Sequence, residues 1–256
     1  LDVRMITALG EDVYAQKITN SCLELGIDLG HSLQVPGGHT STYLFITDEG
    51  GDMELAVSDM AIYERLTPQF LATKVHLFGN ARLVMADTNL PAESLHWLAE
   101  NCKTPIFVDP VSTAKAGKLR PILGKLHTLK PNRIEAELLS GVAITDDASL
   151  ARCADALLAT GLHRVFITLG GDGVYAADHL GGRLKIPCYP AAMVNTTGCG
   201  DAFMAALAWG WLEGLGLEEA ARAGLSASAI SMEGAETINP SLSIPAVQAR
   251  MELPAD

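Results

Sequence analysis

The sequence lacks the features that mark membrane proteins and nucleic-acid-binding proteins. None of its apolar runs approaches the ~18 residues that a bilayer-spanning helix needs. Basic residues are few, since 18 lysines and arginines stand against 30 aspartates and glutamates and give a formal net charge of -12. This charge argues against broad binding to nucleic acids or anionic membranes, although it leaves room for a local basic pocket. With no signal peptide visible, we expect a soluble cytoplasmic protein with no membrane or nucleic-acid partner.

Cysteine is also sparse, and its spacing argues against disulfide and zinc sites. The five cysteines form no CxxC pair, and their odd number fits reduced intracellular thiols. The seven histidines show no metal-ligand spacing either. Low-complexity segments, internal repeats and obvious linkers are absent. The 256 residues, 48% of them apolar, therefore suit one globular domain with a large core.

What the sequence does contain is an alternation of strand and helix patterns. Residues 3–9 form a strand-like run, and residues 12–25 form an amphipathic helix that Gly26 ends. Further strands are expected at 41–47, 53–57, 83–86, 106–108, 128–130, 164–169 and within 174–189, with hairpin residues Asp48 to Gly51 between the first two. Further helices are expected at 68–77, 92–101, 119–126, 134–140, 148–160, 202–212, 217–232 and 244–251. This order predicts an α/β fold with a mostly parallel sheet, helices on both faces, and ligands at the carboxyl ends of the strands.

The run Asn195-Thr196-Thr197-Gly198-Cys199-Gly200-Asp201, just before an apolar helix, is the richest in chemistry. Its two glycines let the backbone aim several N–H groups into one space, where the helix N-terminus adds partial positive charge. A phosphoryl group there would be stabilised, and Asp201 could accept a proton from an attacking hydroxyl. Ordinary helix capping is the alternative, but two glycines around one small residue exceed what capping requires. The run predicts phosphoryl transfer to an alcohol, without the Gly-Lys-Ser/Thr ending of a Walker motif.

Three other segments place polar residues after a strand, and each has a structural alternative. Asn132 and Glu135 either form a helix capping box or hold magnesium, directly or through water. The glycines of Thr168 to Gly173 either admit a ligand or make a tight turn. Asp109, with Lys115 shortly beyond, either meets a polar ligand or starts a turn before a proline. Taken alone, the capping interpretation is favoured for the first segment, and the other two are evenly balanced.

Together and in this order, the four segments resemble the ribokinase-like (PfkB) carbohydrate kinases over essentially the whole chain. Residues 195–201 are similar to the C-terminal signature of that family, 130–137 to its Asn-x-x-Glu segment, 168–173 to its nucleotide-contacting turn, and 8–12 to its early Gly-x-Asp. Asp109-Pro110-Val111-Ser112 with Lys115, and Asn195 in place of the usual aspartate, resemble the pseudouridine kinase branch. The resemblance implies a three-layer α/β/α sandwich with a mostly parallel central sheet and a small β lid.

The resemblance also implies a role for each site residue. Asp201 would be the catalytic base, beside an anion hole formed by Gly198, Cys199 and Gly200. Asn132 and Glu135 would organise Mg2+ and the phosphates of ATP. Further contacts to the nucleotide would come from Thr168, Gly170, Gly173, Thr197 and Asn239, and contacts to the substrate from Asp109, Lys115 and the lid residues Thr40, Ser41 and Thr42. The family pattern also allows a monovalent cation such as K+ and a homodimer paired through its lids.

The family pattern predicts a single kinase domain over residues 1–256, with the lid hairpin inserted at about 40–58. The first core strand, part of the lid and a substrate-facing Gly-Gly segment of that pattern are missing, and Gly37-Gly38 lies too late to replace the last. We expect ATP-dependent phosphorylation of the 5′-hydroxyl of a ribosyl nucleoside, with pseudouridine as the substrate. Two alternatives stay open: a kinase of the same type for another sugar or nucleoside, and a catalytically inactive nucleotide-binding homologue.

Overall fold

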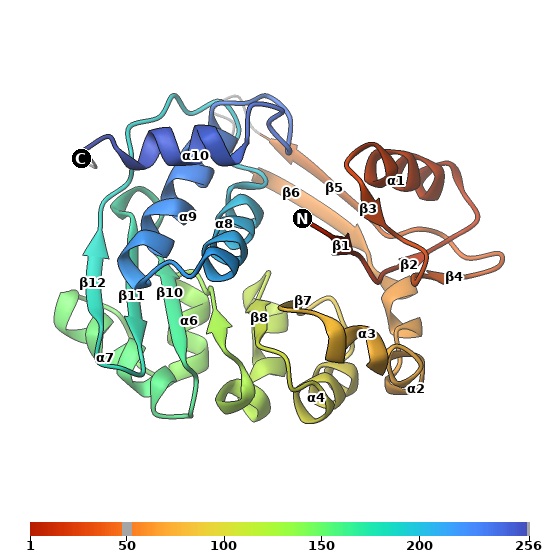
Figure 1. Cartoon of the computed structure of the whole chain (residues 1–256), viewed down its shortest axis with the longest axis horizontal. Helices are drawn as coiled ribbons and strands as arrows, with labels where there is room; N and C mark the ends of the chain where they lie inside the picture. Colours follow the sequence, from red (N-terminus) through yellow and green to blue (C-terminus); the bar gives the residue numbers. More distant parts are fainter. Residues whose placement is uncertain (48–52, 255–256) are drawn as a thin grey trace. The chain divides into compact units, whose positions relative to one another are not determined.

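The computed structural model describes residues 1–47 and 53–254. The chain forms two compact units, of which the first comprises Leu1–Asn80 and Asn89–Asn101 and the second Ala81–Thr88 and Cys102–Asp256. Figure 1 labels most of the helices and strands of both units. The second unit contains the large sheet and therefore the strand ends at which ligands are expected.

The second unit is built on a six-stranded sheet in the order β12-β11-β10-β9-β8-β7. Strands β7 to β10 are parallel, and β11 and β12 continue the sheet as antiparallel strands. In β10, Val165, Phe166 and Ile167 are all buried, which is typical of a strand covered on both faces. The bounds are Val84–Asp87 (β7), Ile106–Asp109 (β8), Thr128–Leu129 (β9), Arg164–Thr168 (β10), Val174–Asp178 (β11) and Arg183–Ile186 (β12).

Helices cover both faces of this sheet, with α8 and α9 on one face and α6 and α7 on the other (Figure 1). Phe203 and Leu207 of α8 share a buried cluster with Phe166 of β10. Helices α8 and α9 approach closely because Gly224 has no side chain, and a Cβ there would lie 2.6 Å from the Phe203 ring. The bounds are Thr113–Ala116 (α5), Arg133–Ser140 (α6), Asp147–Leu158 (α7), Cys199–Glu213 (α8), Leu217–Met232 (α9) and Ile244–Met251 (α10), with 3₁₀ helices at Gly117–Lys125 (η2) and Gly170–Asp172 (η3).

The first unit combines short strand pairs and helices around its own small core. Strand β1 pairs with β3 and β2 with β4, both parallel, and β5 and β6 form an antiparallel hairpin. Ala8, Ile62 and Leu66 are buried together in this core. The bounds are Val3–Arg4 (β1), Ala8–Leu9 (β2), Val13–Glu24 (α1), Ile27–Asp28 (β3), Leu33–Gln34 (β4), Thr42–Thr47 (β5), Met53–Asp59 (β6), Ala61–Arg65 (η1), Pro68–Ala72 (α2), Val75–Asn80 (α3) and Ala92–Asn101 (α4). The expected hairpin residues Asp48 to Gly51 lie outside the described residues.

The mostly parallel sheet and its two helical layers agree with the sequence-based expectation, but two elements of the first unit differ. Residues 3–9 form two strands rather than one. In the residues that separate these strands, the Ser32 hydroxyl accepts the N–H of Thr7 and donates to the carbonyl of Met5. These two backbone groups therefore bond a side chain instead of a neighbouring strand. The helix expected at 68–77 is divided after Ala72, where the N–H groups of Thr73 and Lys74 bond three residues back instead of four.

Two elements of the second unit also differ from expectation. Residues 117–125 form a 3₁₀ helix with Pro121 inside, since proline cannot donate the hydrogen bond of an α-helical interior. Helix α8 begins at Cys199 rather than near Ala202, so Asp201 lies in its first turn. In residues 1–47 and 53–254, no helix combines the length and apolar character needed to cross a membrane.

Candidate functional site

The carboxyl ends of the four parallel strands bring polar residues to one edge of the sheet. Asp87 ends β7 and stands opposite Asp109, which ends β8. Lys130 follows β9, and Thr168 ends β10, where it forms a bridge to Asn132. Of these residues, Asp109, Asn132 and Thr168 were predicted to face ligands, and the structure places all three at the expected edge.

An ion pair between Lys130 and Asp109 lies at this edge. The Nζ of Lys130 is 2.9 Å from Oδ2 of Asp109, and the two side chains are 6% and 18% exposed. The other oxygen of Asp109 accepts the N–H of Val111 at 3.0 Å. Val111 has a φ of 62°, a conformation that a β-branched residue rarely adopts. Both oxygens of Asp109 are therefore engaged, in a loop with a strained backbone.

The predicted phosphate run forms a tight turn at the N-terminus of α8. Gly198 is the N-cap with a φ of 89°, and a Cβ there would lie 2.3 Å from the carbonyl oxygen of Thr237. The N–H of Thr197 donates to Oδ1 of Asn195 at 2.9 Å. The N–H of Cys199 donates at 3.3 Å to the carbonyl of Thr196, so an anion here would compete with a long bond. N–H groups of a first helical turn have no partner within the helix, which makes this turn suited to an anion.

Asp201, in this first turn, belongs to a charge cluster that also contains Lys130, Asp109 and Asp87. A Cβ on the neighbouring Gly200 would lie 3.5 Å from Nζ of Lys130, so the lysine reaches the α8 turn. Partial loss of hydration raises the pKa of the Asp201 carboxyl, and the charges of Asp109 and Asp87 raise it further, whereas Lys130 lowers it. A carboxylate with a raised pKa is a better proton acceptor than a fully hydrated aspartate.

Asn132 and Glu135 form a capping box, which was one of the two roles that the sequence allowed for them. The N–H of Glu135 donates to Oδ1 of Asn132 at 2.9 Å, and the N–H of Asn132 donates to Oε2 of Glu135 at 2.8 Å. Glu135 is only 2% exposed. Burial raises the pKa of its carboxyl; the Asn132 bond lowers it, Asp109 raises it and Lys130 lowers it. The two residues therefore have a structural role, and they also lie within the charge cluster.

The same contacts limit how this pair could hold magnesium. Among the described residues, no group of three or more His, Cys, Asp or Glu side chains could hold a metal ion. The Asn132 side-chain oxygen and one Glu135 oxygen are occupied by the cap. Mg2+ commonly keeps several waters and binds one or two carboxylates together with substrate phosphates. The chemistry of this pair fits that mode, and it does not fit a cage of protein ligands.

The turn after β10 contains two glycines with positive φ values. Gly170 and Gly173 have φ values of 62° and 89°. A Cβ on Gly173 would lie 1.9 Å from the Ile186 carbonyl oxygen, so this position requires glycine, whereas Gly170 has open space around it. The backbone N–H of Thr168 donates to the carbonyl of Pro131 at 2.9 Å, which ties this turn to the Asn132 segment.

Asn239 was predicted to contact the nucleotide, but its side chain is committed inside the protein. Its Nδ2 donates to the Ile230 carbonyl at 2.6 Å, and its Oδ1 accepts the N–H of Ser241 at 2.9 Å. Asn239 is buried, and a Cβ on Gly234 would lie 2.7 Å from its side chain. The residue therefore orders the loop after α9, and its side-chain amide is not presented to a ligand.

The lid residues Thr40, Ser41 and Thr42 belong to the first unit. Thr40 is 3% exposed, and its hydroxyl donates to Asp12 at 2.8 Å while accepting the N–H of Gly10. This hydroxyl could not face a substrate without breaking both bonds. Ser41 donates its hydroxyl to the Tyr63 hydroxyl at 2.7 Å, and it is partly exposed, as Thr42 is. Lys115, the remaining substrate candidate, is partly exposed on α5 in the second unit.

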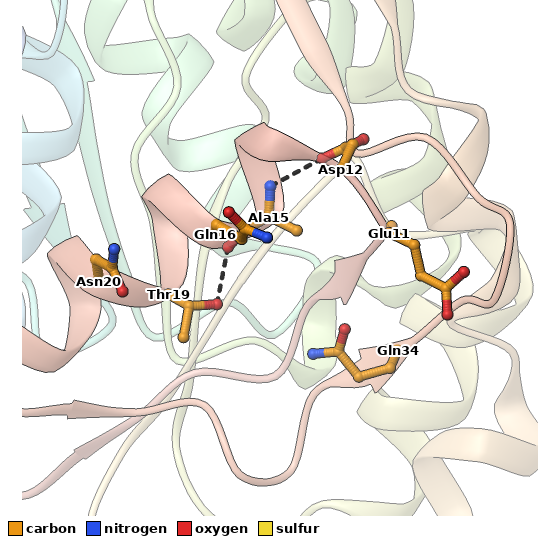
Figure 2. Close-up of a pocket in the computed structure, with 8 residues that line it drawn as sticks. Glu11, Asp12, Ala15, Gln16, Thr19, Asn20 and Gln34 are labelled. Atoms are coloured by element: carbon orange, nitrogen blue, oxygen red, sulfur yellow. Dashed lines mark hydrogen bonds between the residues drawn. The ribbon is translucent and has the colours of Figure 1, made fainter.

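The early Gly10-Glu11-Asp12 segment borders a polar hollow of about 500 Å³ in the first unit. Figure 2 shows Gln16, Thr19 and Asn20 of α1 on one side and Gln34 of β4 on another. Asp12 caps α1 through Ala15 and also accepts the N–H of Thr40 at 2.6 Å. These contacts give the segment a structural role, because they join α1 to the start of the hairpin.

Two members of the charge cluster carried no role in the sequence-based prediction. Lys130 lies directly before Pro131-Asn132 but had no assigned contact, and Asp87 directly followed the strand predicted at 83–86 without an assigned role. A usable signal existed, since both follow strands whose carboxyl ends share one edge. The sequence does not show which polar residues at the strand ends form ion pairs with one another, because that depends on the order of the strands in the sheet.

The chain is similar in sequence and fold to several known kinases. Residues 1–244 match the pfkB family of carbohydrate kinases. The chain is 38% identical to the pseudouridine kinase of Escherichia coli (strain K12), over 94% of this chain and 77% of that protein, and 36% identical to the uncharacterized sugar kinase YeiI of the same strain, over 94% and 67%. The ribokinase of Thermotoga maritima has the same fold, with a TM-score of 0.85 over 98% of this chain and 81% of that one at 24% identity. The chain therefore belongs to the pfkB family of carbohydrate kinases.

Proposed function

We propose that this kinase transfers the γ-phosphoryl group of ATP to the 5′-hydroxyl of a ribosyl nucleoside, with pseudouridine as the substrate. The observation that carries the proposal is Asp201 in the first turn of α8, beside Lys130 and Asp109 at the carboxyl edge of the sheet. The pseudouridine kinase of Escherichia coli, 38% identical, supports this choice of substrate.

In the proposed reaction, the 5′-hydroxyl oxygen of the nucleoside attacks the γ-phosphorus. A new O–P bond forms, the bond from the γ-phosphorus to the β,γ-bridging oxygen breaks, and ADP leaves with that electron pair. Asp201 accepts the hydroxyl proton, which its raised pKa favours. The N–H groups of the first α8 turn stabilise charge on the transferring group, the main contribution that a protein makes to this chemistry.

The nucleotide is assigned to the turns that follow β9 and β10. Thr168 and Gly170 would lie along the phosphates, and Gly173 would hold the shape of the turn. Asn132 and Glu135 would orient a magnesium ion through water, and that ion would neutralise phosphate charge. The capping bonds occupy the side-chain oxygen of Asn132 and one carboxylate oxygen of Glu135, which favours contact through water over direct ligation.

Replacement of Asp201 by asparagine tests the proposed base. We expect Asp201→Asn to lower kcat for pseudouridine by ~10²–10⁴-fold, because a general base typically contributes that much. The control is Asp147→Asn, which alters another aspartate in the first turn of a helix, there paired with Lys185 at 2.8 Å. The control should keep near-normal turnover. Equal activity of Asp201→Asn and the unmodified protein would refute the assignment.

A substrate panel separates this proposal from its rivals. Pseudouridine, uridine, other nucleosides and free ribose would each be offered with ATP and Mg2+, and ADP release would be followed. The similarity to an uncharacterized sugar kinase, at 36% identity, keeps another sugar or nucleoside as the second candidate. A strong preference for free ribose would select that candidate, and ATP binding without any product would indicate an inactive nucleotide-binding homologue.

A further inference from the structure

Lys130 is unusual among the basic residues of this chain. In residues 1–47 and 53–254, no other lysine or arginine is classed as buried. An ammonium group that loses hydration is costly unless it is paired, and Asp109 supplies that partner at 2.9 Å. A buried ion pair at a strand end contributes little to stability compared with apolar packing, so a functional reason for it is worth testing.

The surroundings of Lys130 point to that reason. Its ammonium group lies beside the N-terminal turn of α8, 3.5 Å from the position that a Cβ on Gly200 would take. A helix N-terminus carries partial positive charge, so a cation there is unfavourable unless negative charge accompanies it. The negative groups at this point are Asp109 from β8, Asp201 in the turn itself, Asp87 from β7 and Glu135 in the first turn of α6. Lys130 therefore stands between several carboxylates and the turn assigned to the phosphoryl group.

We propose that Lys130 is a positioning residue of the transfer site, which through its ion pair with Asp109 fixes the α8 turn and offsets the negative charge around Asp201 and the incoming phosphates. This role rests on the proposed function, since it takes Asp201 as the proton acceptor. Without the ammonium group, the carboxylates coupled to this cluster would lose that counter-charge. The strained Val111 backbone, bonded to Asp109, would hold the other end of the pair in place.

The role makes a specific prediction for the pH profile of turnover. Lys130 lowers the pKa of Asp201 and Asp109 raises it, with Asp87 acting in the same direction as Asp109; Cys199 is the other titratable neighbour, on α8 itself. Turnover requires ionised Asp201, so the acidic limb of the profile follows its pKa. Lys130→Met should therefore move that limb to higher pH by about one unit, and Asp109→Asn should move it to lower pH.

The experiment compares Lys130→Met, Lys130→Arg, Asp109→Asn and the double variant Lys130→Met/Asp109→Asn. We expect Lys130→Met to lower kcat at neutral pH by roughly 10–100-fold, because the α8 turn would shift and the transferring group would lose a counter-charge. Lys130→Arg should restore most of the loss. The double variant should return the acidic limb toward that of the unmodified enzyme, because both opposing charges are gone. The control is Lys185→Met, which breaks the exposed pair with Asp147 and should leave the profile unchanged.

The outcomes separate positioning from packing. If Lys130→Met and the double variant lose equal activity with an unmoved acidic limb, Lys130 has a packing role only and the proposal is overturned. If Lys130→Met does not fold, the double variant, which removes both charges of the ion pair, still allows the pH profile of turnover to be measured. If the unmodified protein phosphorylates no sugar or nucleoside, the proposed function fails separately. In that case, carbon-13 titration of the Asp201 carboxyl in the unmodified protein and the double variant, assigned through Asp201→Asn, still decides whether the pair sets its ionisation.

Discussion

At the scale of single residues, replacement of Gly198 tests whether the turn before α8 needs a glycine. Its φ of 89° is strained for any other residue, and a Cβ would collide with the Thr237 carbonyl oxygen at 2.3 Å. We expect Gly198→Ala to lower the free energy of unfolding by about 2–5 kcal/mol, as the sum of backbone strain and overpacking. Turnover should fall on the order of 10²-fold, because the α8 turn would move relative to Lys130.

Gly181 provides a matched control for the same substitution. It has a φ of 98°, but nothing lies within 4 Å of the position that a Cβ would take. Gly181→Ala should therefore show only the backbone cost of about 1–2 kcal/mol, with normal turnover. Urea unfolding and steady-state kinetics on both variants give the comparison. Similar losses of stability in the two variants would mean that the Thr237 contact contributes nothing.

Single residues also show which roles could be predicted from the sequence and which could not. Gly198 and Asp201 were predictable, because glycine spacing and a carboxylate near a helix start express local backbone geometry. Thr40 and Asn239 were assigned to ligands because the family resemblance implied those roles, yet both bond inside the protein. The partners of Thr40 lie about 30 positions away, at Gly10 and Asp12, and sequence alone does not show such distant hydrogen bonds.

At the scale of elements, the start of α6 can be compared with the start of α7. Both helices begin with a capping box, through Asn132 and Glu135 in one and Asp146 and Ser149 in the other. Asn132→Ala and Asp146→Ala should each lower the free energy of unfolding by about 1 kcal/mol. Only Asn132→Ala should raise the KM for MgATP, because only that cap lies at the proposed nucleotide site.

Thermal unfolding and ATP kinetics at varied Mg2+ measure both effects. An unchanged KM in Asn132→Ala, together with the expected loss of stability, would leave that residue as a cap alone. Helix starts with polar caps were otherwise well predicted, as for α1, where Asp12 bonds the Ala15 N–H at 2.9 Å. The start of α8 was misplaced by three residues because its N-cap is a glycine, which gives no side-chain signal.

At the scale of the whole molecule, the alternation of patterns was enough to predict the parallel sheet and its helical layers. Burial on both faces makes each central strand an apolar run, and that feature is visible in the chain itself. The pairing of Lys130 with Asp109 was not predictable, because it depends on β8 and β9 being neighbours in the sheet. Spatial order, rather than residue type, therefore sets the limit of what the sequence reveals about the site.

The opposite end of the sheet carries a group that links global stability to pH. His127 precedes β9 and stacks on Phe107 with ring centroids 5.3 Å apart. Burial, followed by the charges of His163, Arg164 and His179, lowers its pKa to about 4. The folded state therefore resists protonation of this ring, while the unfolded chain accepts the proton near the ordinary histidine pKa of about 6.5.

The sign of the pH dependence follows from that difference. Between about pH 6.5 and pH 4 the unfolded state binds more protons at this position, so stability falls as the pH falls. A shift of this size corresponds to about 3 kcal/mol as an upper figure, because the ring is only partly buried. The raised pKa values of Asp201 and Glu135 act in the opposite direction, since protonation of those carboxyls favours the folded state. The net slope of stability with pH therefore mixes both effects.

Replacement of His127 by phenylalanine separates them. We expect urea unfolding of His127→Phe to show a smaller loss of stability between pH 7 and pH 4 than the unmodified protein, because the carboxyl contributions are the same in both. His96→Gln, which alters an exposed histidine, is the control and should keep the original slope. Parallel slopes for His127→Phe and the unmodified protein would contradict the role assigned to His127.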